Sequence, residues 1–122
     1  MTNNNIVETR SGYIEGYYGQ LFDWPARHEL VAVMASLGMN SYLYAPKDDA
    51  AHRFAWRIPY DAQWRSCFAD FAAAARQNID VMAGIAPGLD FNFAELEKTS
   101  DGDFACLVKK AQQLSVDGAS HI

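Results

Sequence analysis

The chain has 122 residues, and half of them are hydrophobic, which predicts one folded domain with a real core rather than a disordered chain. Its net charge of −5 and its lack of basic runs argue against nucleic acid and anionic membrane surfaces as partners. The polar N-terminus has no apolar signal-peptide core, and no apolar run is long enough to span a bilayer, so we expect a cytoplasmic location.

The first predicted unit is a short strand at residues 12–16 followed by a helix. Asp23 has the chemistry of an N-cap, and Pro25 fits the first helical turn. Gly38 is expected to end the helix, because glycine readily takes the left-handed conformation found at helix ends. Apolar residues recur along this segment at the spacing of one buried helix face: Leu30, Val33, Met34 and Leu37.

The second predicted unit pairs a strand at residues 40–45 with a helix that Asp61 caps and that ends near Asn78. Its apolar stripe has the clearest helical period in the chain: Trp64, Cys67, Phe68, Phe71, Ala72 and Ala75. Cys67 lies on this stripe and Cys106 on that of the next helix. Both are therefore expected to be buried thiols, and neither a disulfide nor a metal pair is expected.

The third predicted unit has a strand at residues 79–86 and a helix that starts near Asp101 or Asp103. Gly118 is expected to end this helix, and the segment 121–122 resembles the start of a fourth strand. The apolar face expected for the helix consists of Phe104, Leu107, Val108, Ala111 and Leu114.

Strands that alternate with helices predict an α/β fold with a parallel sheet and right-handed crossovers. Two successive strands end in similar loops, Ala-Pro-Lys-Asp at 45–48 and Ala-Pro-Gly-Leu-Asp at 86–90, which suits a (β/α)8 TIM barrel. A flavodoxin-like sheet is the alternative, but the turn at 16–20 lacks a glycine-rich phosphate loop. A TIM barrel needs roughly 200 residues, so this chain would supply about three of its eight units and the start of strand four.

In either fold, the loops that follow the carboxyl ends of the strands meet on one face, and that face binds ligands. The loops at the opposite end are short, as is typical of a fold with one active face. The candidate site residues are Glu15, Gly16, Tyr17, Tyr18, Gly19, Lys47, Asp48, Asp49, His52, Arg53, Gly88, Asp90 and Asn92.

Each of these residues also has a structural interpretation. Lys47 either binds a ligand or is a solvated lysine that pairs with Asp48 or Asp49, and the two aspartates also suit helix caps or loop hydrogen bonds. Glu15 is expected as a carboxylate in the barrel interior with a structural partner. His52 is expected at the surface rather than as a ligand. The residues alone therefore predict an acidic enzyme face with one cation and do not select a substrate.

Three motifs resemble the start of the catalytic domain of glycoside hydrolase family 84, the O-GlcNAcase family of β-N-acetylglucosaminidases, often labelled hyaluronidase-like. They are Glu-Gly-Tyr-Tyr-Gly at 15–19, Tyr-Leu-Tyr-Ala-Pro-Lys-Asp-Asp at 42–49 with His-Arg at 52–53 and Trp-Arg at 56–57, and Ala-Pro-Gly-Leu-Asp at 86–90. The resemblance covers residues 11–122 and leaves residues 1–10 as an N-terminal extension. It implies a TIM barrel that supplies the N-terminal part of a catalytic domain.

The resemblance also implies a reaction and its site residues. The family cleaves β-linked N-acetylglucosamine with retention, and the acetamide of the substrate acts as the nucleophile, so no metal or organic cofactor is expected. Gly16 matches the glycine whose backbone contacts a sugar hydroxyl, and Lys47 matches the lysine that hydrogen-bonds the sugar. Asp48 and Asp49 match acidic neighbours, which we expect to hold Lys47 in place. The expected partner is a glycan or glycoprotein that bears N-acetylglucosamine.

The chain departs from the family pattern in one respect. The catalytic pair of the family is two adjacent aspartates at the end of strand four, and in this sequence they are expected just beyond Ile122. We therefore expect no hydrolysis from these residues alone. The alternative function is a non-catalytic module that binds N-acetylglucosamine or a partner protein. Three strands of a barrel leave open edges, so self-association or a complementing barrel fragment is also expected.

Overall fold

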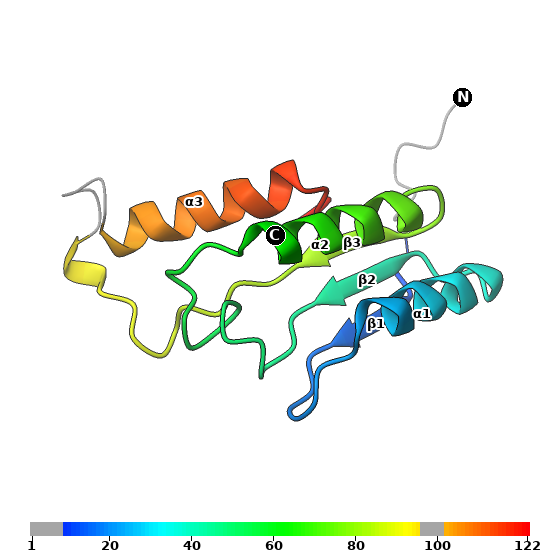
Figure 1. Cartoon of the computed structure of the whole chain (residues 1–122), viewed down its shortest axis with the longest axis horizontal. Helices are drawn as coiled ribbons and strands as arrows, with labels where there is room; N and C mark the ends of the chain where they lie inside the picture. The colour runs from blue at the N-terminus through cyan, green and yellow to red at the C-terminus, as the bar shows by residue number, and fades with distance from the viewer. Residues whose placement is uncertain (1–8, 96–101) are drawn as a thin grey trace.

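The computed structural model describes residues 9–95 and 102–122, so most of the predicted N-terminal extension and the candidate helix start at Asp101 lie outside the described residues. Strands and helices alternate as the sequence predicts (Figure 1). The elements are β1 (Gly12–Glu15), α1 (Trp24–Ser36), β2 (Ser41–Tyr44), α2 (Ala62–Ala75), β3 (Asp80–Ala83), the short 3-10 helix η1 (Phe93–Glu95) and α3 (Asp103–Val116).

The three strands form a parallel sheet in the order β1-β2-β3. The start of a fourth strand is also present, because Met82 forms a parallel bridge with His121. The Ala83 N–H donates to the His121 carbonyl at 3.0 Å, and the Ser120 N–H donates to the Val81 carbonyl at 2.7 Å. The strand expected at 121–122 therefore begins beside β3, and the sequential order differs from that of a flavodoxin-like sheet.

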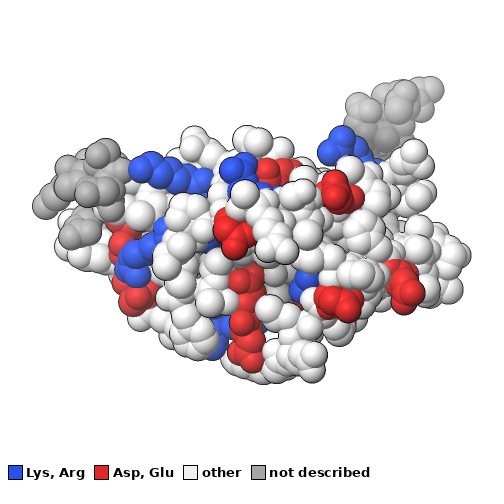
Figure 2. All heavy atoms as spheres, viewed as in Figure 1, with Lys and Arg blue, Asp and Glu red and all other residues white. Residues whose placement is uncertain are grey.

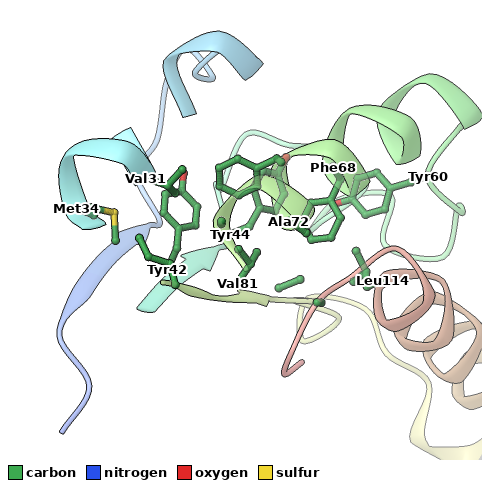
Figure 3. Close-up of a cluster of buried hydrophobic side chains, with 14 residues drawn as sticks. Val31, Met34, Tyr42, Tyr44, Tyr60, Phe68, Ala72, Val81 and Leu114 are labelled. Carbon is green, nitrogen blue, oxygen red and sulfur yellow. The ribbon is translucent and has the colours of Figure 1, made fainter. Parts of the chain in front are cut away.

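All three helices pack on the same face of the sheet. Tyr42 and Tyr44 of β2 point into a core that also contains Phe68 of α2 and Leu114 of α3, and Figure 3 shows this core between sheet and helices. On the opposite face of the sheet, Ile14 is 70% exposed. A doubly wound sheet carries helices on both faces, so this one-sided arrangement fits a strip of barrel wall instead.

The helix ends follow the predicted signals. Asp23 caps α1 by accepting from the Ala26 N–H at 2.8 Å, and Asp61 caps α2 by accepting from the Trp64 N–H at 2.8 Å. After α1, Gly38 has a φ of 77°, a left-handed conformation that glycine adopts without strain. Helix α2 was expected to end near Asn78. It ends at Ala75, and residues 76–78 form the turn that follows it.

The apolar stripe predicted for α2 is confirmed at four of its six residues, whereas Trp64 and Cys67 are only partly buried. Phe68 and Phe71 are fully buried, and Ala72 and Ala75 are nearly so. The ring of Phe68 stacks on that of Trp64, with centroids 4.9 Å apart and planes 9° apart. Four small or aromatic residues on one stripe let α2 pack against the sheet, and Figure 3 shows Phe68 and Ala72 beside Tyr44 and Val81.

The face predicted for α1 is only partly correct, because Met34 is buried and Leu30 packs against the core but the other two predicted residues are exposed. Val33 and Leu37 are 56% and 68% exposed, whereas Val31 and Met34 are buried. The cause is Arg27, which is buried although it is charged, because its guanidinium has a carboxylate partner beneath the helix. Turning Arg27 inward also turns Val31 and Met34 inward, since they lie four and seven residues further along.

The face predicted for α3 is only partly correct. Leu114 is buried, but Phe104 is 44% exposed and Val108 is 37% exposed. Two charged residues of α3 are buried instead, Asp103 and Lys110. They bind the loops that precede α3 rather than the sheet, and apolar spacing alone does not predict such contacts.

Both cysteines are partly exposed rather than buried, and no disulfide joins Cys67 to Cys106 in the described part of the chain. None of the described helices has the length and apolar composition needed to cross a membrane. On the face drawn in Figure 2, acidic and basic side chains are interspersed. A face of mixed sign offers no broad positive patch to a polyanion.

Lys110 allows a test of the loop packing. Its Nζ donates to the carbonyl of Ile58 and lies 4.4 Å from the ring centroid of Tyr60, and burial lowers its pKa to about 8. The unfolded chain therefore binds more protons above pH 8, so this group adds stability as the pH rises from 8 towards 10.5. Between pH 7 and about 9.5, we expect the free energy of unfolding to rise by about 1–2 kcal/mol relative to Lys110→Met.

Chemical denaturation of both proteins at several pH values measures this difference. The upper pH limit keeps the comparison below the usual tyrosine pKa of about 10. A difference that stays constant over the range would show that Lys110 is not held in a desolvated position.

Candidate active-site face

The loops that follow the three strands lie at one end of the sheet (Figure 1). The loop between β2 and α2 runs from residue 45 to 61 and is the longest connection without a helix or strand in the described chain. At the other end, the connection from α1 to β2 takes only residues 37–40. Long loops gathered at the carboxyl ends of parallel strands are the usual position of a ligand site in α/β proteins.

Gly16 and Lys47, the two residues predicted to bind substrate, lie next to each other. A Cβ atom placed on Gly16 would be 3.8 Å from the Lys47 Nζ and 3.3 Å from Ile14 Cγ2. The Lys47 N–H also donates to the carbonyl of Tyr17 at 3.1 Å, which joins the two loops. A primary ammonium group therefore lies over a stretch of backbone without a side chain, on the sheet face opposite the helices.

Asp48 fixes the geometry of the first loop. Its Oδ2 accepts from the N–H of Gly19 at 2.7 Å, and Gly19 has a φ of 103°, which other residues rarely adopt. The carboxylate of Asp48 is exposed and is already occupied on one oxygen. Asp48 thus ties the loop after β1 to the loop after β2.

Asp49 holds two tyrosines of the core at the helix side of the sheet. It is buried and accepts from the hydroxyls of Tyr44 at 2.6 Å and Tyr60 at 2.8 Å, and from the Ala51 N–H at 3.0 Å. Burial and the nearby carboxylate raise the pKa of both tyrosines above the usual value, so they stay neutral hydrogen-bond donors. Asp49 thereby fixes the start of α2 relative to β2.

The expected role of the two aspartates as direct supports of Lys47 is not what the contacts show. Within residues 9–95 and 102–122, no hydrogen bond or ion pair joins the Lys47 side chain to Asp48 or Asp49. Asp48 binds backbone and Asp49 binds tyrosines. The reason is that adjacent residues point in different directions, and each carboxylate finds its nearest donors elsewhere.

Glu15 has the structural partner that we expected, but it points to the helix side of the sheet and not to the barrel interior. It is fully buried and accepts from Arg27 Nε at 2.9 Å and Arg27 Nη2 at 2.8 Å. The hydroxyl of Tyr17 donates to it at 3.2 Å, and that of Tyr42 donates as well. Burial alone would lower the pKa of Arg27, but its hydrogen bonds to Glu15 raise it, so the guanidinium stays charged.

His52 is buried, which corrects the expected surface position. Its Nδ1–H donates to the carbonyl of Gly84 at 2.7 Å, and the backbone carbonyl of His52 accepts from the Ala86 N–H at 2.9 Å. Burial lowers the pKa of His52. The histidine thus joins the loop after β2 to the loop after β3, and this long-range contact has no signal in the local sequence.

Asp90 belongs to a structural network as well. Its carboxylate accepts from Trp56 Nε1 at 2.9 Å and from Arg57 Nη1 at 2.8 Å, and Arg57 also binds Asp103 at 2.7 Å. These hydrogen bonds, first that of Trp56 and then that of Arg57, lower the pKa of Asp90. Asn92 joins the same network through its N–H, which donates to Asp103. Asp90 of the third motif therefore ties the loop after β3 to the loop before α2 and, through Arg57, to the start of α3.

Tyr60 was missed as a residue that supports the loop between β2 and α2. It is buried, it donates to Asp49, and its ring stacks on Trp64 with centroids 3.5 Å apart. A sequence signal was present, because an apolar residue directly before a helix N-cap often packs on the first turn of that helix. Here the N-cap is Asp61.

The one-sided parallel sheet, with a glycine and a lysine at the carboxyl ends of adjacent strands, places the chain among α/β proteins with a ligand face at one end of the sheet. Comparison with known families is more specific. The family described as beta-N-acetylglucosaminidase matches residues 11–122, and the chain belongs to this family.

Relatives and solved structures agree with this assignment. The protein O-GlcNAcases of Rattus norvegicus and Mus musculus are each 35% identical over 108 residues, which cover 88% of this chain and 11% of theirs. An O-GlcNAc hydrolase point mutant from Thermobaculum terrenum has a TM-score of 0.81 and 29% identity over 90% of this chain and 23% of its own. The structure of CpGH84B has a TM-score of 0.80 and 32% identity over 92% of this chain and 20% of its own. The chain therefore spans about a tenth of the length of these curated relatives.

Proposed function

We propose that these residues bind the N-acetylglucosamine unit of the substrate of a retaining β-N-acetylglucosaminidase. The observation that carries the proposal is the Lys47 Nζ above the backbone of Gly16, in a chain whose residues 11–122 match that family. A lysine ammonium offers three donors to sugar hydroxyls, and a glycine leaves room for the sugar ring to approach the backbone. The substrate proposed is a glycan or glycoprotein with β-linked N-acetylglucosamine, and the site needs no cofactor.

We further propose that the chain is the first part of a (β/α)8 barrel, with about three βα units and the start of strand four. The support is the uncovered sheet face, where a hollow of about 240 Å³ is lined in part by Ile14, Leu43 and Met82. These three residues are paired across the strands, so they form one apolar row on the face opposite the helices. Further strands, or a second copy of the chain, would cover that row.

The chemistry proposed for the whole enzyme needs two carboxylates, one to polarise the acetamide and one to act as general acid and base. The sequence has one pair of adjacent aspartates, Asp48 and Asp49. Asp48 already accepts a hydrogen bond from a backbone N–H, and Asp49 accepts from two tyrosine hydroxyls. We therefore propose that this chain binds the sugar but does not cleave its bond. The alternative, a non-catalytic sugar-binding module, would use the same pocket.

Replacing Lys47 by alanine tests the proposed pocket. We expect N-acetylglucosamine to bind the unmodified chain and to bind Lys47→Ala about tenfold or more weakly, because a hydrogen bond to a charged group contributes about 1.5–3 kcal/mol. Titration followed by two-dimensional NMR measures the affinity and shows that the variant is folded. Arg76→Gln, which removes an exposed cation after α2, is the matched control and should leave binding unchanged. Equal affinity in Lys47→Ala would refute the pocket.

A further inference from the structure

Arg53 differs from most other arginines of the described chain. The arginines at positions 10, 27, 57 and 65 each form an ion pair with a carboxylate. Arg53 forms none, and its nearest side-chain hydrogen-bond partner is the hydroxyl of Tyr18 at 3.5 Å, the outer limit for such a bond. Its Nε is buried and has no acceptor. An unsatisfied buried donor is uncommon in folded proteins, and this one has no protein acceptor among the described residues.

Two exposed rings flank the guanidinium. Its Cζ lies 5.4 Å from the ring centroid of Tyr18 and 4.3 Å from that of Phe54, and these rings belong to residues that are 68% and 60% exposed. Cation–π contacts on this scale orient the planar group but do not neutralise its charge. Large exposed aromatic side chains beside an unpaired arginine are typical of a binding surface rather than of a solvated loop.

The cluster of Tyr18, Arg53 and Phe54 lies at the edge of the proposed sugar pocket. Tyr18 follows the Gly16 loop, and Arg53 lies in the same loop as Lys47. The Lys47 N–H donates to the carbonyl of Tyr17, and the Arg53 guanidinium reaches the hydroxyl of the adjacent Tyr18, so both cationic residues contact the same turn. Asp48 lies in the same loop, and one of its oxygens already accepts from the Gly19 N–H.

We propose that Arg53, oriented by Tyr18 and Phe54, binds an oxyanion carried by the group that is linked to the sugar. The oxyanion is a carboxylate or a phosphate, because both match the planar fork of a guanidinium. This inference rests on the proposed sugar pocket, since Lys47 and Gly16 would bind the sugar while Arg53 binds the charged group that is linked to it. It assigns substrate preference to a residue that takes no part in the chemical step.

Matched glycosides test this assignment. Phenyl, 4-carboxyphenyl and 4-phosphonooxyphenyl β-N-acetylglucosaminides differ only in the charge of the group linked to the sugar. At low salt, we expect the unmodified chain to bind at least one anionic glycoside about three- to tenfold more tightly than the phenyl glycoside. The preferred anion identifies the oxyanion, and added salt should reduce the preference because the site is partly exposed.

Variants separate the subsite from the sugar pocket. Arg53→Gln should lose the preference for anionic glycosides and keep its affinity for the phenyl glycoside. Arg53→Lys keeps the positive charge but not the planar guanidinium, so it should keep only part of the preference. Arg76→Gln removes an equal charge elsewhere and should keep the whole preference. Equal binding of the three glycosides by the unmodified chain, or an undiminished preference in Arg53→Gln, would overturn the inference and leave the sugar pocket intact.

A second readout works without the sugar. The Nε–H signal of Arg53 in NMR spectra should shift when benzoate or phenyl phosphate is added, since this donor has no acceptor in the protein. If no glycoside binds, the proposed function fails, and this signal then decides on the subsite alone. A shift that is saturable and salt-sensitive supports the oxyanion site, and an unmoved signal refutes it.

Discussion

Replacing Glu15 by alanine should destabilise the protein by about 3–5 kcal/mol, because it leaves the buried charge of Arg27 without its partner. Both side chains are almost fully buried, and the pair shares three hydrogen bonds. The same change removes the acceptor of the Tyr42 hydroxyl in the core. Since small domains are stable by only about 5–15 kcal/mol, the loss is a large share of the total.

Urea denaturation followed by circular dichroism measures the effect. Asp80→Asn is the matched control, because it breaks the exposed ion pair with Arg10, in which both side chains are about two-fifths exposed. That change should cost no more than about 1 kcal/mol. The double variant Glu15→Leu with Arg27→Met removes both charges and should recover much of the lost stability. If Glu15→Ala costs no more than Asp80→Asn, the buried pair does not hold β1 to α1.

The chain should hydrolyse a chromogenic aryl β-N-acetylglucosaminide no faster than buffer does. General acid–base catalysis contributes about 10²- to 10⁴-fold on its own, and it needs a carboxylate free to exchange a proton with the substrate. Asp49 is buried between two tyrosine hydroxyls, and Asp48 is bound to the Gly19 backbone. Glu15 is neutralised by Arg27 on the other side of the sheet.

The assay compares the chain with Asp49→Asn and with a complete enzyme of the family under the same conditions. The complete enzyme shows that the substrate is competent. A rate above that of buffer which disappears in Asp49→Asn would overturn the prediction, because it would show that a residue of this chain performs the proton transfer. A rate that persists unchanged in the variant would point to a contaminating enzyme.

Much of the fold could be predicted because its signals are local. The caps Asp23 and Asp61 start helices where the sequence indicates, and the stripe through Phe68 and Phe71 is buried as expected. A cap acts within its own first turn and a stripe within its own helix, so neither depends on distant residues. The strand at 121–122 was predicted in the same way and is present as a bridge to β3.

The errors have a common cause in long-range pairing of polar groups. The buried face of α1 was only partly correct because Arg27 follows Glu15 into the core, twelve positions away in sequence. His52 was expected at the surface but is buried, because the carbonyl of Gly84 accepts its proton. Apolar periodicity assigns charged and polar side chains to the surface, and it has no information on a partner that lies on another strand.

The sequence by itself determined the order of strands and helices, the parallel sheet and the family, because alternation, caps and three ordered motifs all lie in short segments of chain. Only the tertiary structure decided how the site residues are used. It brought Lys47 over Gly16, assigned Asp48 to the Gly19 backbone and Asp49 to tyrosines, and left Arg53 without a carboxylate. The physical reason is that a buried polar group needs a hydrogen-bond or ion-pair partner, and that partner is often distant in sequence and becomes known only in the folded chain.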